Sequence, residues 1–402
     1  MSLYGGIYLQ ALTVEQVEDY FAQVGLQDVW QTVQQDEALQ ELLTKPLFLS
    51  MFGWVQKQGQ FSLSDWRSRT TSDRKIEYLL DTYWEAAITR ELIIDPNDKQ
   101  RGILSKTYGT KPLPTRKAVQ RALVFVAKVL EQELQTDFLI EALQPCHLFS
   151  KELKETYCIR VKWGIDLILG LLFGIFIGFT EKSPSGLIAV IIFVLISGKK
   201  PEFFQKIQPV ESLGWSWVRA RLALKNVLFV LLIVVPALLF VFLFLSPKIN
   251  LFFGVIATIF IVIPLGLTAG VFGVDIESKR IPNQGILKSV ASFLIVSLMG
   301  GILLGVIVGL SIKLTGQSTN WFVTGIGALL FLGLILGLNF GGYACIQHLA
   351  LRLILYRNGS ISWDYARFLN YATERLLLQR IGGCYRFMHK LLQDHFAKMD
   401  WE

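Results

Sequence analysis

The chain has 402 residues, a net charge of +7, and 52% hydrophobic against only 18% charged residues. Its mean hydropathy of +0.45 is too apolar for a soluble domain of this length. The four cysteines lack C-x-x-C spacing, which argues against a disulfide framework or a metal site. Basic residues concentrate beside apolar runs. This placement indicates that their partner is anionic lipid, and it argues against nucleic-acid binding.

The first 150 residues are typical of soluble helical sequence. Residues 4–10 predict a short strand with no sheet partner in the chain, and Thr13 with Gln16 predicts a capping box that opens the first helix. Apolar residues at helical spacing predict further helices. These cover residues 28–43, 46–57, 72–91, 115–135 and 137–143, with a loop over residues 95–114.

Residues 163–342 contain a series of long apolar runs, each near the roughly 20 residues that a helix needs to cross a hydrocarbon core of about 30 Å. Six membrane spans are predicted, at residues 164–180, 183–198, 227–246, 251–272, 290–311 and 321–342. The second run is the shortest. The Glu181-Lys182-Ser183-Pro184 break before it predicts a hairpin with the first span.

The charges of the connections predict an orientation for these spans. Basic residues are frequent before the first span, between the second and third, and after the fourth. The other connections carry only Lys182, Lys248 and Lys313. The positive-inside rule therefore predicts a multi-pass protein of a plasma membrane with both termini in the cytoplasm.

Glycines recur at four-residue spacing within the predicted spans, so they form stripes along single helix faces. Such stripes let helix backbones approach closely in lipid, which predicts a compact helix bundle. The alternative is a pore or substrate path lined by glycine backbone. The stripes consist of Gly170, Gly174 and Gly178, of Gly301, Gly305 and Gly309, and of Gly333, Gly337 and Gly341.

A short amphipathic stretch enters the third span. Trp215 and Trp217 have side chains suited to the headgroup level of a bilayer, and three cations follow them, suited to anionic lipid. The cations are Arg219, Arg221 and Lys225. The simpler interpretation is anchoring and orientation at the lipid interface, and the alternative is a regulated lipid sensor.

Residues 343–402 lie beyond the last span and return to soluble sequence. Residues 363–375 predict a helix, and residues 376–381 and 384–388 predict two strands joined at Gly382-Gly383, a pair that gives a hairpin turn its positive φ. A last helix is predicted at residues 389–398. Helix, hairpin and helix form the second half of a winged-helix domain, and the first half falls within residues 62–150.

The predicted fold is therefore mainly α-helical. A cytosolic helical domain precedes a six-helix transmembrane bundle, which is inserted in a split winged-helix-like domain with a small C-terminal β-hairpin.

Five segments resemble the C-terminal part of bacterial, cyanobacterial-type NACHT or STAND NTPases that carry a multi-span membrane insertion. They are residues 36–50, 135–145, 209–217, 282–286 and 385–396. The last of these is similar to a Phe-x-His-x-x-x-Gln-Glu-x-Phe closing motif, with Asp394 in place of the usual Glu. The resemblance implies that residues 1–61 comprise the last strand of an NTPase core and a helical domain.

The chain departs from this family at the nucleotide site. No Gly-Lys-Ser/Thr phosphate loop occurs in its sequence, so no catalytic residue is predicted, and ATP or GTP would be bound only through a partner NTPase core. In the family a winged-helix histidine contacts the nucleotide's β-phosphate. The resemblance makes His389 the nearest equivalent, and the alternative is a histidine that bridges the final helix and the hairpin.

The sequence thus predicts a non-enzymatic, membrane-anchored signalling or regulatory module. Its expected partners are the lipid bilayer, an NTPase-core chain and a second copy of itself. The alternative function is a small multi-span channel or transporter, although Asp166 and Asn339 are almost the only polar residues that the runs offer for transport. An intramembrane enzyme has no supporting constellation of residues.

Overall fold

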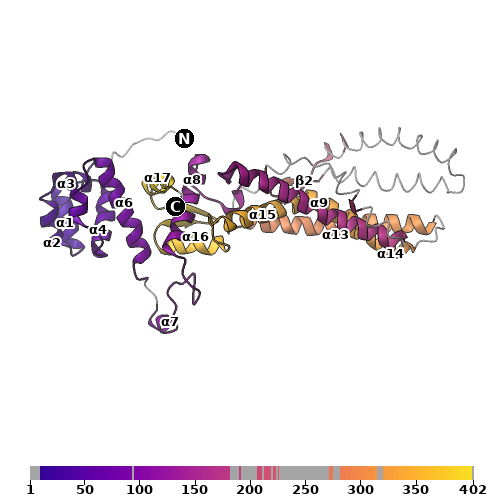
Figure 1. The fold of residues 1–402 in the computed structure, drawn as a ribbon, viewed down its shortest axis with the longest axis horizontal. Coiled ribbons are helices and arrows are strands. Elements are labelled where there is room, and N and C mark those ends of the chain that lie inside the picture. Colours follow the sequence, from indigo (N-terminus) through magenta and orange to yellow (C-terminus); the bar gives the residue numbers. More distant parts are fainter. Residues whose placement is uncertain are drawn as a thin grey trace. The chain divides into compact units, whose positions relative to one another are not determined.

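A computed structural model describes residues 10–92, 95–181, 190–191, 206–210, 212–218, 221–222, 225, 271–274, 281–314 and 320–400. These residues are mainly helical, with a small antiparallel hairpin near the C-terminus (Figure 1). The chain divides into two compact units. Unit 1 comprises Met1–Phe138, Asp364–Ile381 and Tyr385–Glu402, and unit 2 comprises Leu139–Trp363 and Gly382–Cys384.

Five short helices begin unit 1: α1 (Val14–Gln23), α2 (Gln27–Val33), α3 (Glu37–Leu43), α4 (Pro46–Lys57) and α5 (Leu63–Arg67). The predicted capping box of Thr13 and Gln16 is confirmed at α1. The single helix predicted over residues 28–43 is wrong, because Asp36 accepts a hydrogen bond from the Leu39 amide (3.0 Å) and caps a new helix there.

The remainder of unit 1 combines elements from both ends of the chain. They are α6 (Ser72–Thr89), α7 (Pro96–Gln100), α8 (Arg116–Gln132), α16 (Tyr365–Glu374), β3 (Leu378–Ile381), β4 (Cys384–Phe387) and α17 (Lys390–Lys398). The loop predicted over residues 95–114 thus contains the short α7. β3 begins two residues later than predicted because Leu376 has a φ of 60°, which no strand residue adopts.

The first and last parts of unit 1 are joined by polar contacts as well as by apolar packing. Phe138 exchanges two backbone hydrogen bonds with Tyr385 of β4, at 2.7 and 2.9 Å. The helix predicted over residues 137–143 is therefore wrong, since its first residues pair like a strand. Beside this bridge, the Arg386 guanidinium donates to both carboxylate oxygens of Asp137, at 2.7 and 3.0 Å.

Two arginines at helix ends strengthen the same junction. Arg90 follows α6 and donates to the Glu374 carbonyl, while Arg375 follows α16 and donates to the Arg90 carbonyl. Each guanidinium thus satisfies a carbonyl at the C-terminal end of the other helix, where the helix dipole favours a cation.

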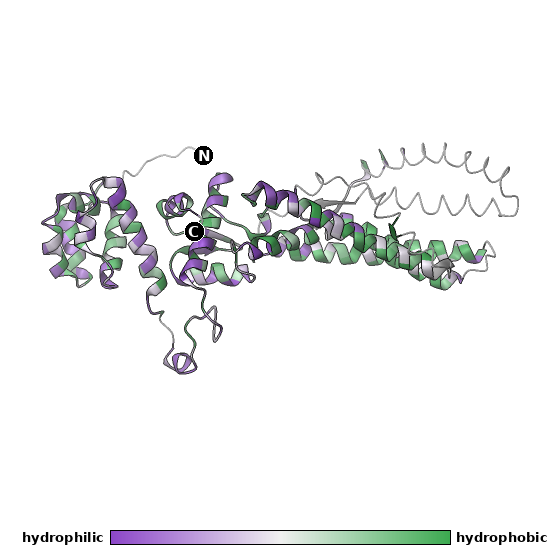
Figure 2. Ribbon diagram, viewed as in Figure 1, coloured by the Kyte–Doolittle hydropathy of each residue, from purple (hydrophilic) through white to green (hydrophobic). Residues whose placement is uncertain are grey.

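Among its described residues, unit 2 contains three helices that are long and apolar enough to cross a membrane, at Lys151–Gly178, Gln284–Leu314 and Trp321–Arg357. Its elements are η1 (Ile140–Ala142), η2 (Pro145–His147), α9 (Lys151–Glu181), β1 (Ser212–Trp215), β2 (Val271–Val274), α13 (Gln284–Leu314), α14 (Trp321–Gly337), η4 (Leu338–Gly342) and α15 (Tyr343–Arg357). Figure 2 shows mostly apolar residues along α13 and α14, whereas α1–α4 mix both kinds.

Three of the six predicted spans coincide with these helices. The runs at residues 183–198, 227–246 and 251–270 lie outside the described residues, except for Val190 and Ile191, which are helical. The predicted end of the fourth span is wrong, because Val271 and Phe272 belong to β2, which pairs antiparallel with β1.

Glycines lie where α13 and α14 pack against each other. A Cβ added to Gly301 would lie 2.6 Å from the Leu329 carbonyl oxygen, and one added to Gly333 would lie 2.8 Å from the Gly301 Cα. In α9, by contrast, a Cβ on Gly178 would meet no heavy atom of the described residues within 4 Å, while Gly170 and Gly174 are buried.

Candidate functional site

The chain enters unit 2 through η1, where a buried carboxylate meets the start of a long apolar helix. Glu141 is 1% exposed, and its Oε2 accepts a hydrogen bond from the Gly285 amide at 2.6 Å. Gly285 lies in the first turn of α13, whose amides lack partners within the helix and whose dipole favours negative charge. The carboxylate therefore caps α13 from a distant part of the chain.

Ile140, the residue before Glu141, contacts another helix. The Ile140 carbonyl accepts a hydrogen bond from Nε2 of His348 in α15, at 3.0 Å, and the His348 ring is 2% exposed. Two consecutive residues of η1 thus contact two different apolar helices, α13 and α15.

A second segment, residues 206–210, is fastened to the same place. The Gln144 side chain donates to the Ile207 carbonyl (3.0 Å) and accepts from the Ile207 amide (2.8 Å). The hydroxyl of Ser289, which is fully buried in α13, accepts from the Val210 amide at 2.8 Å. We call this set the polar hub; it consists of Ile140, Glu141, Gln144, Ile207, Val210, Gly285, Ser289 and His348.

Next to the hub, the helix formed by α14 and α15 is interrupted. η4 is a stretch of π-helix, which we call the π segment, and within it Phe340 (φ −106°, ψ 47°) and Gly341 (φ 114°) leave the helical conformation. Gly341 packs so closely on Ser289 that an added Cβ would clash with the Ser289 carbonyl oxygen and lie 3.1 Å from its Cα. The positive φ and this contact both require glycine.

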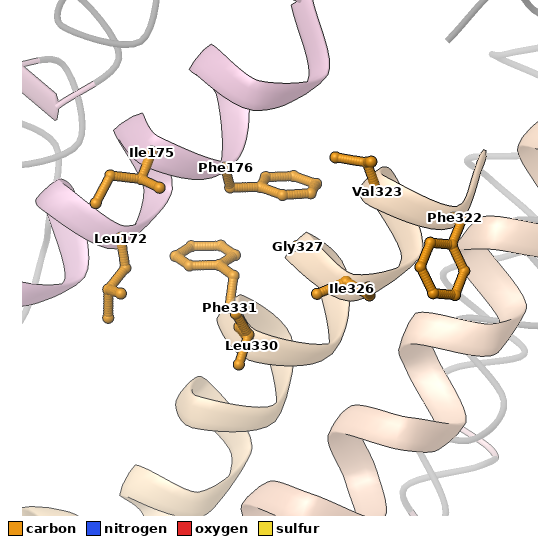
Figure 3. A pocket seen from close by; sticks show the side chains of 9 residues that line it. All are labelled: Leu172, Ile175, Phe176, Phe322, Val323, Ile326, Gly327, Leu330 and Phe331. Atoms are coloured by element: carbon orange, nitrogen blue, oxygen red, sulfur yellow. The ribbon is translucent and has the colours of Figure 1, made fainter. Parts of the chain in front are cut away.

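A separate cavity of about 250 Å³ lies between α9 and α14 (Figure 3). Phe176 of α9 stacks on Phe331 of α14 with ring centroids 6.1 Å apart, and the Phe176 ring also covers Gly327. Every side chain of its lining is apolar. The cavity therefore offers helix packing rather than catalytic chemistry.

The residues predicted at the lipid interface are described only in part. Trp215 is the last residue of β1, Trp217 is 65% exposed, and Arg219 lies outside the described residues. Arg221 and Lys225 are helical and exposed.

His389 precedes α17 as its N-cap residue, and its side chain makes no capping hydrogen bond. Burial lowers the pKa of the His389 imidazole from its ordinary value of 6.5. These facts place it at the hairpin-to-helix junction of unit 1.

The lowered pKa predicts a pH dependence of stability. The folded state disfavours protonation of His389, so the contribution of this residue to the free energy of unfolding is fully present above pH 6.5. This contribution is lost as the pH falls from 6.5 through the lower pKa of the folded state. Between about pH 5 and pH 7, the melting temperature of the full chain should therefore change less in His389→Gln than in the wild type. Identical pH profiles would contradict this role.

Sequence reasoning did not identify the polar hub. Residues of three segments that carry the predicted family resemblance, 135–145, 209–217 and 282–286, take part in it. A further signal was available, because Glu141 is a single acidic residue within the apolar stretch Phe138-Leu139-Ile140-Glu141-Ala142-Leu143.

Comparison of the chain with protein-family models, with curated proteins and with solved structures finds no match. The hub fastens the starts of two apolar helix segments and residues 206–210 to the part of the chain that emerges from unit 1.

Proposed function

We propose that the chain is a membrane-anchored signalling or regulatory module without catalytic activity of its own, related to NACHT-type STAND NTPases. The observation that carries this proposal is the insertion of the apolar helices within unit 1. The chain leaves unit 1 after Phe138 and re-enters it at Asp364. A change in the membrane-spanning part thus reaches unit 1 through both ends of the insertion.

The polar hub provides a route for such a change. Phe138 is fixed to β4 within unit 1 by two backbone hydrogen bonds, and only Leu139 separates it from Ile140 and Glu141, which hold α15 and α13. A shift of either helix would therefore act on a strand-like residue of unit 1 through a very short connection.

The arrangement of unit 1 supports the winged-helix-like part of the proposal. Phe138 pairs with one edge of β4 and β3 pairs with the other, so the hairpin is extended by a strand-like residue that follows α8. Helices α8 and α16 come from opposite sides of the insertion. In this proposal the insertion is a six-helix bundle in a bacterial plasma membrane, and both termini are cytoplasmic.

The glycine packing favours this function over a channel. Gly301, Gly305 and Gly333 face backbone atoms of the neighbouring helix at distances that leave no room for a side chain. A water-filled path lined by these glycines is therefore not available between α13 and α14.

The expected partner is a separate NTPase-core chain. Purification of the tagged full-length chain from its native membranes should recover a protein that carries a Gly-Lys-Ser/Thr phosphate loop. The variant Ile7→Asp places a charge in the strand predicted at residues 4–10 and should reduce recovery about tenfold or more, because a charge buried in a partner sheet is costly. Gln35→Asp, at an exposed position, is the matched control. Recovery of the chain alone, in a stable and monodisperse form, would overturn the proposal.

A further inference from the structure

A cavity of about 230 Å³ opens where α14 ends and the π segment begins. Its polar lining comes from residues 206–208, the π segment and α15, and includes Lys206, Gln208, Asn339, Tyr343 and Gln347. A single water needs only about 10–15 Å³ of such space. The cavity is therefore large enough for a polyatomic group.

One donor in the lining has no partner in the part of the chain that the structure describes. Gln347 is 3% exposed, yet its side-chain Nε2 makes no hydrogen bond. A buried amide without a partner is destabilising, and a group bound in the cavity would satisfy it.

The charge of the lining selects the kind of group. Lys206 is an exposed cation, and none of the described ion pairs uses it. Among the described residues, the lining contains no aspartate or glutamate. The nearby carboxylate of Asp166 is already paired with Lys162 at 2.7 Å. A cation and an unpartnered amide donor together fit an oxyanion.

The position of the cavity along α14 points to a source for this oxyanion. α14 has 17 residues from Trp321 to Gly337, which at 1.5 Å per residue span about 26 Å, close to a hydrocarbon core of about 30 Å. If Trp321 lies at one interface, the π segment lies near the other, at the level of the lipid phosphates. The indole of Trp321 under the Lys313 ammonium (5.0 Å) is typical of an interface.

We propose that this cavity binds a phosphate group, presented by the headgroup of an anionic phospholipid, with Lys206 and Gln347 as its ligands. The inference is independent of the proposed signalling function, because it depends only on the cavity and on the membrane-spanning helices.

Native mass spectrometry of the full chain, released from phosphatidylcholine vesicles that contain phosphatidylglycerol, tests this site. Lys206→Ala and Gln347→Leu should each reduce retained phosphatidylglycerol about tenfold. Gln347→Leu should not lower the melting temperature, since it removes an unpartnered polar group. Lys151→Ala, which removes an exposed cation of α9, should retain lipid like the wild type.

A second arm separates lipid from soluble phosphate. Inorganic phosphate is added to the chain in an uncharged detergent, and its effect on the melting temperature is compared between wild type and both variants. Stabilisation of the wild type alone by phosphate, without selective lipid retention, would overturn the headgroup source. Equal behaviour of wild type and both variants toward both probes would overturn the site.

Discussion

Replacing Gly333 with valine is expected to separate α13 from α14 and to destabilise this helix pair of unit 2 strongly. A Cβ at this position would clash with the Ser297 carbonyl oxygen and lie 2.8 Å from the Gly301 Cα. Because both atoms belong to the backbone, no side chain can move aside, and the helices themselves must shift. Overpacking of this kind costs about 1–3 kcal/mol or more. The measurement is thermal unfolding of the full chain in detergent, together with hydrogen exchange of α13 and α14.

Gly164→Val is the matched control for this experiment. Gly164 is an exposed residue of α9, and an added Cβ would meet no heavy atom within 4 Å. The substitution introduces the same β-branched side chain into a helix without a packing conflict. Equal destabilisation by Gly164→Val and Gly333→Val would show that helix propensity, rather than the contact between helices, determines the effect.

The glycine stripes of α13 and α14 illustrate what the sequence could predict about the long apolar helices of unit 2. Four-residue spacing defines a face of each helix, and lipid makes close backbone contact the available driving force. The spacing does not specify which faces meet. That Gly301 and Gly333 meet each other follows from the antiparallel packing of α13 on α14, a contact between helices that no local pattern encodes.

Helix ends in unit 1 show a second limit of sequence reasoning. The break at Asp36 was missed because apolar residues continue at helical spacing on both sides of it, whereas the decisive event is one side-chain hydrogen bond to the Leu39 amide. The error at residues 137–143 has a different origin. Phe138 pairs with Tyr385, nearly 250 residues away, so tertiary pairing overrides local helical periodicity.

The polar hub was missed for a related reason. His348 has no carboxylate or cysteine neighbour at ligand spacing in the sequence, which predicts a structural histidine and no particular partner. In the structure its partner is the Ile140 carbonyl, a backbone group that composition and motifs cannot reveal. Glu141 could have been recognised as exceptional in its apolar surroundings, but its partner, the Gly285 amide, could not.

Replacing Glu141 with alanine is expected to loosen the start of α13 and to destabilise unit 2. The substitution leaves the Gly285 amide buried without an acceptor and removes a negative charge from the N-terminal end of a 31-residue helix. Loss of a buried, charge-assisted hydrogen bond costs about 2–4 kcal/mol when its partner stays unsatisfied. The Gly285 amide should therefore exchange its hydrogen with deuterated solvent much faster than in the wild type, and the melting temperature should fall.

Two further variants separate the causes of this effect. Glu141→Gln retains an acceptor oxygen but not the charge. The free energy of unfolding should therefore fall by only about 1 kcal/mol, the usual size of a helix-dipole interaction. Glu152→Ala removes an exposed carboxylate from α9 and should change neither measurement. If Glu141→Ala leaves the exchange of Gly285 unchanged, the carboxylate does not cap α13. The hub would then not connect this helix to the chain that emerges from unit 1, and the proposed route from the apolar helices to unit 1 would lose its first step.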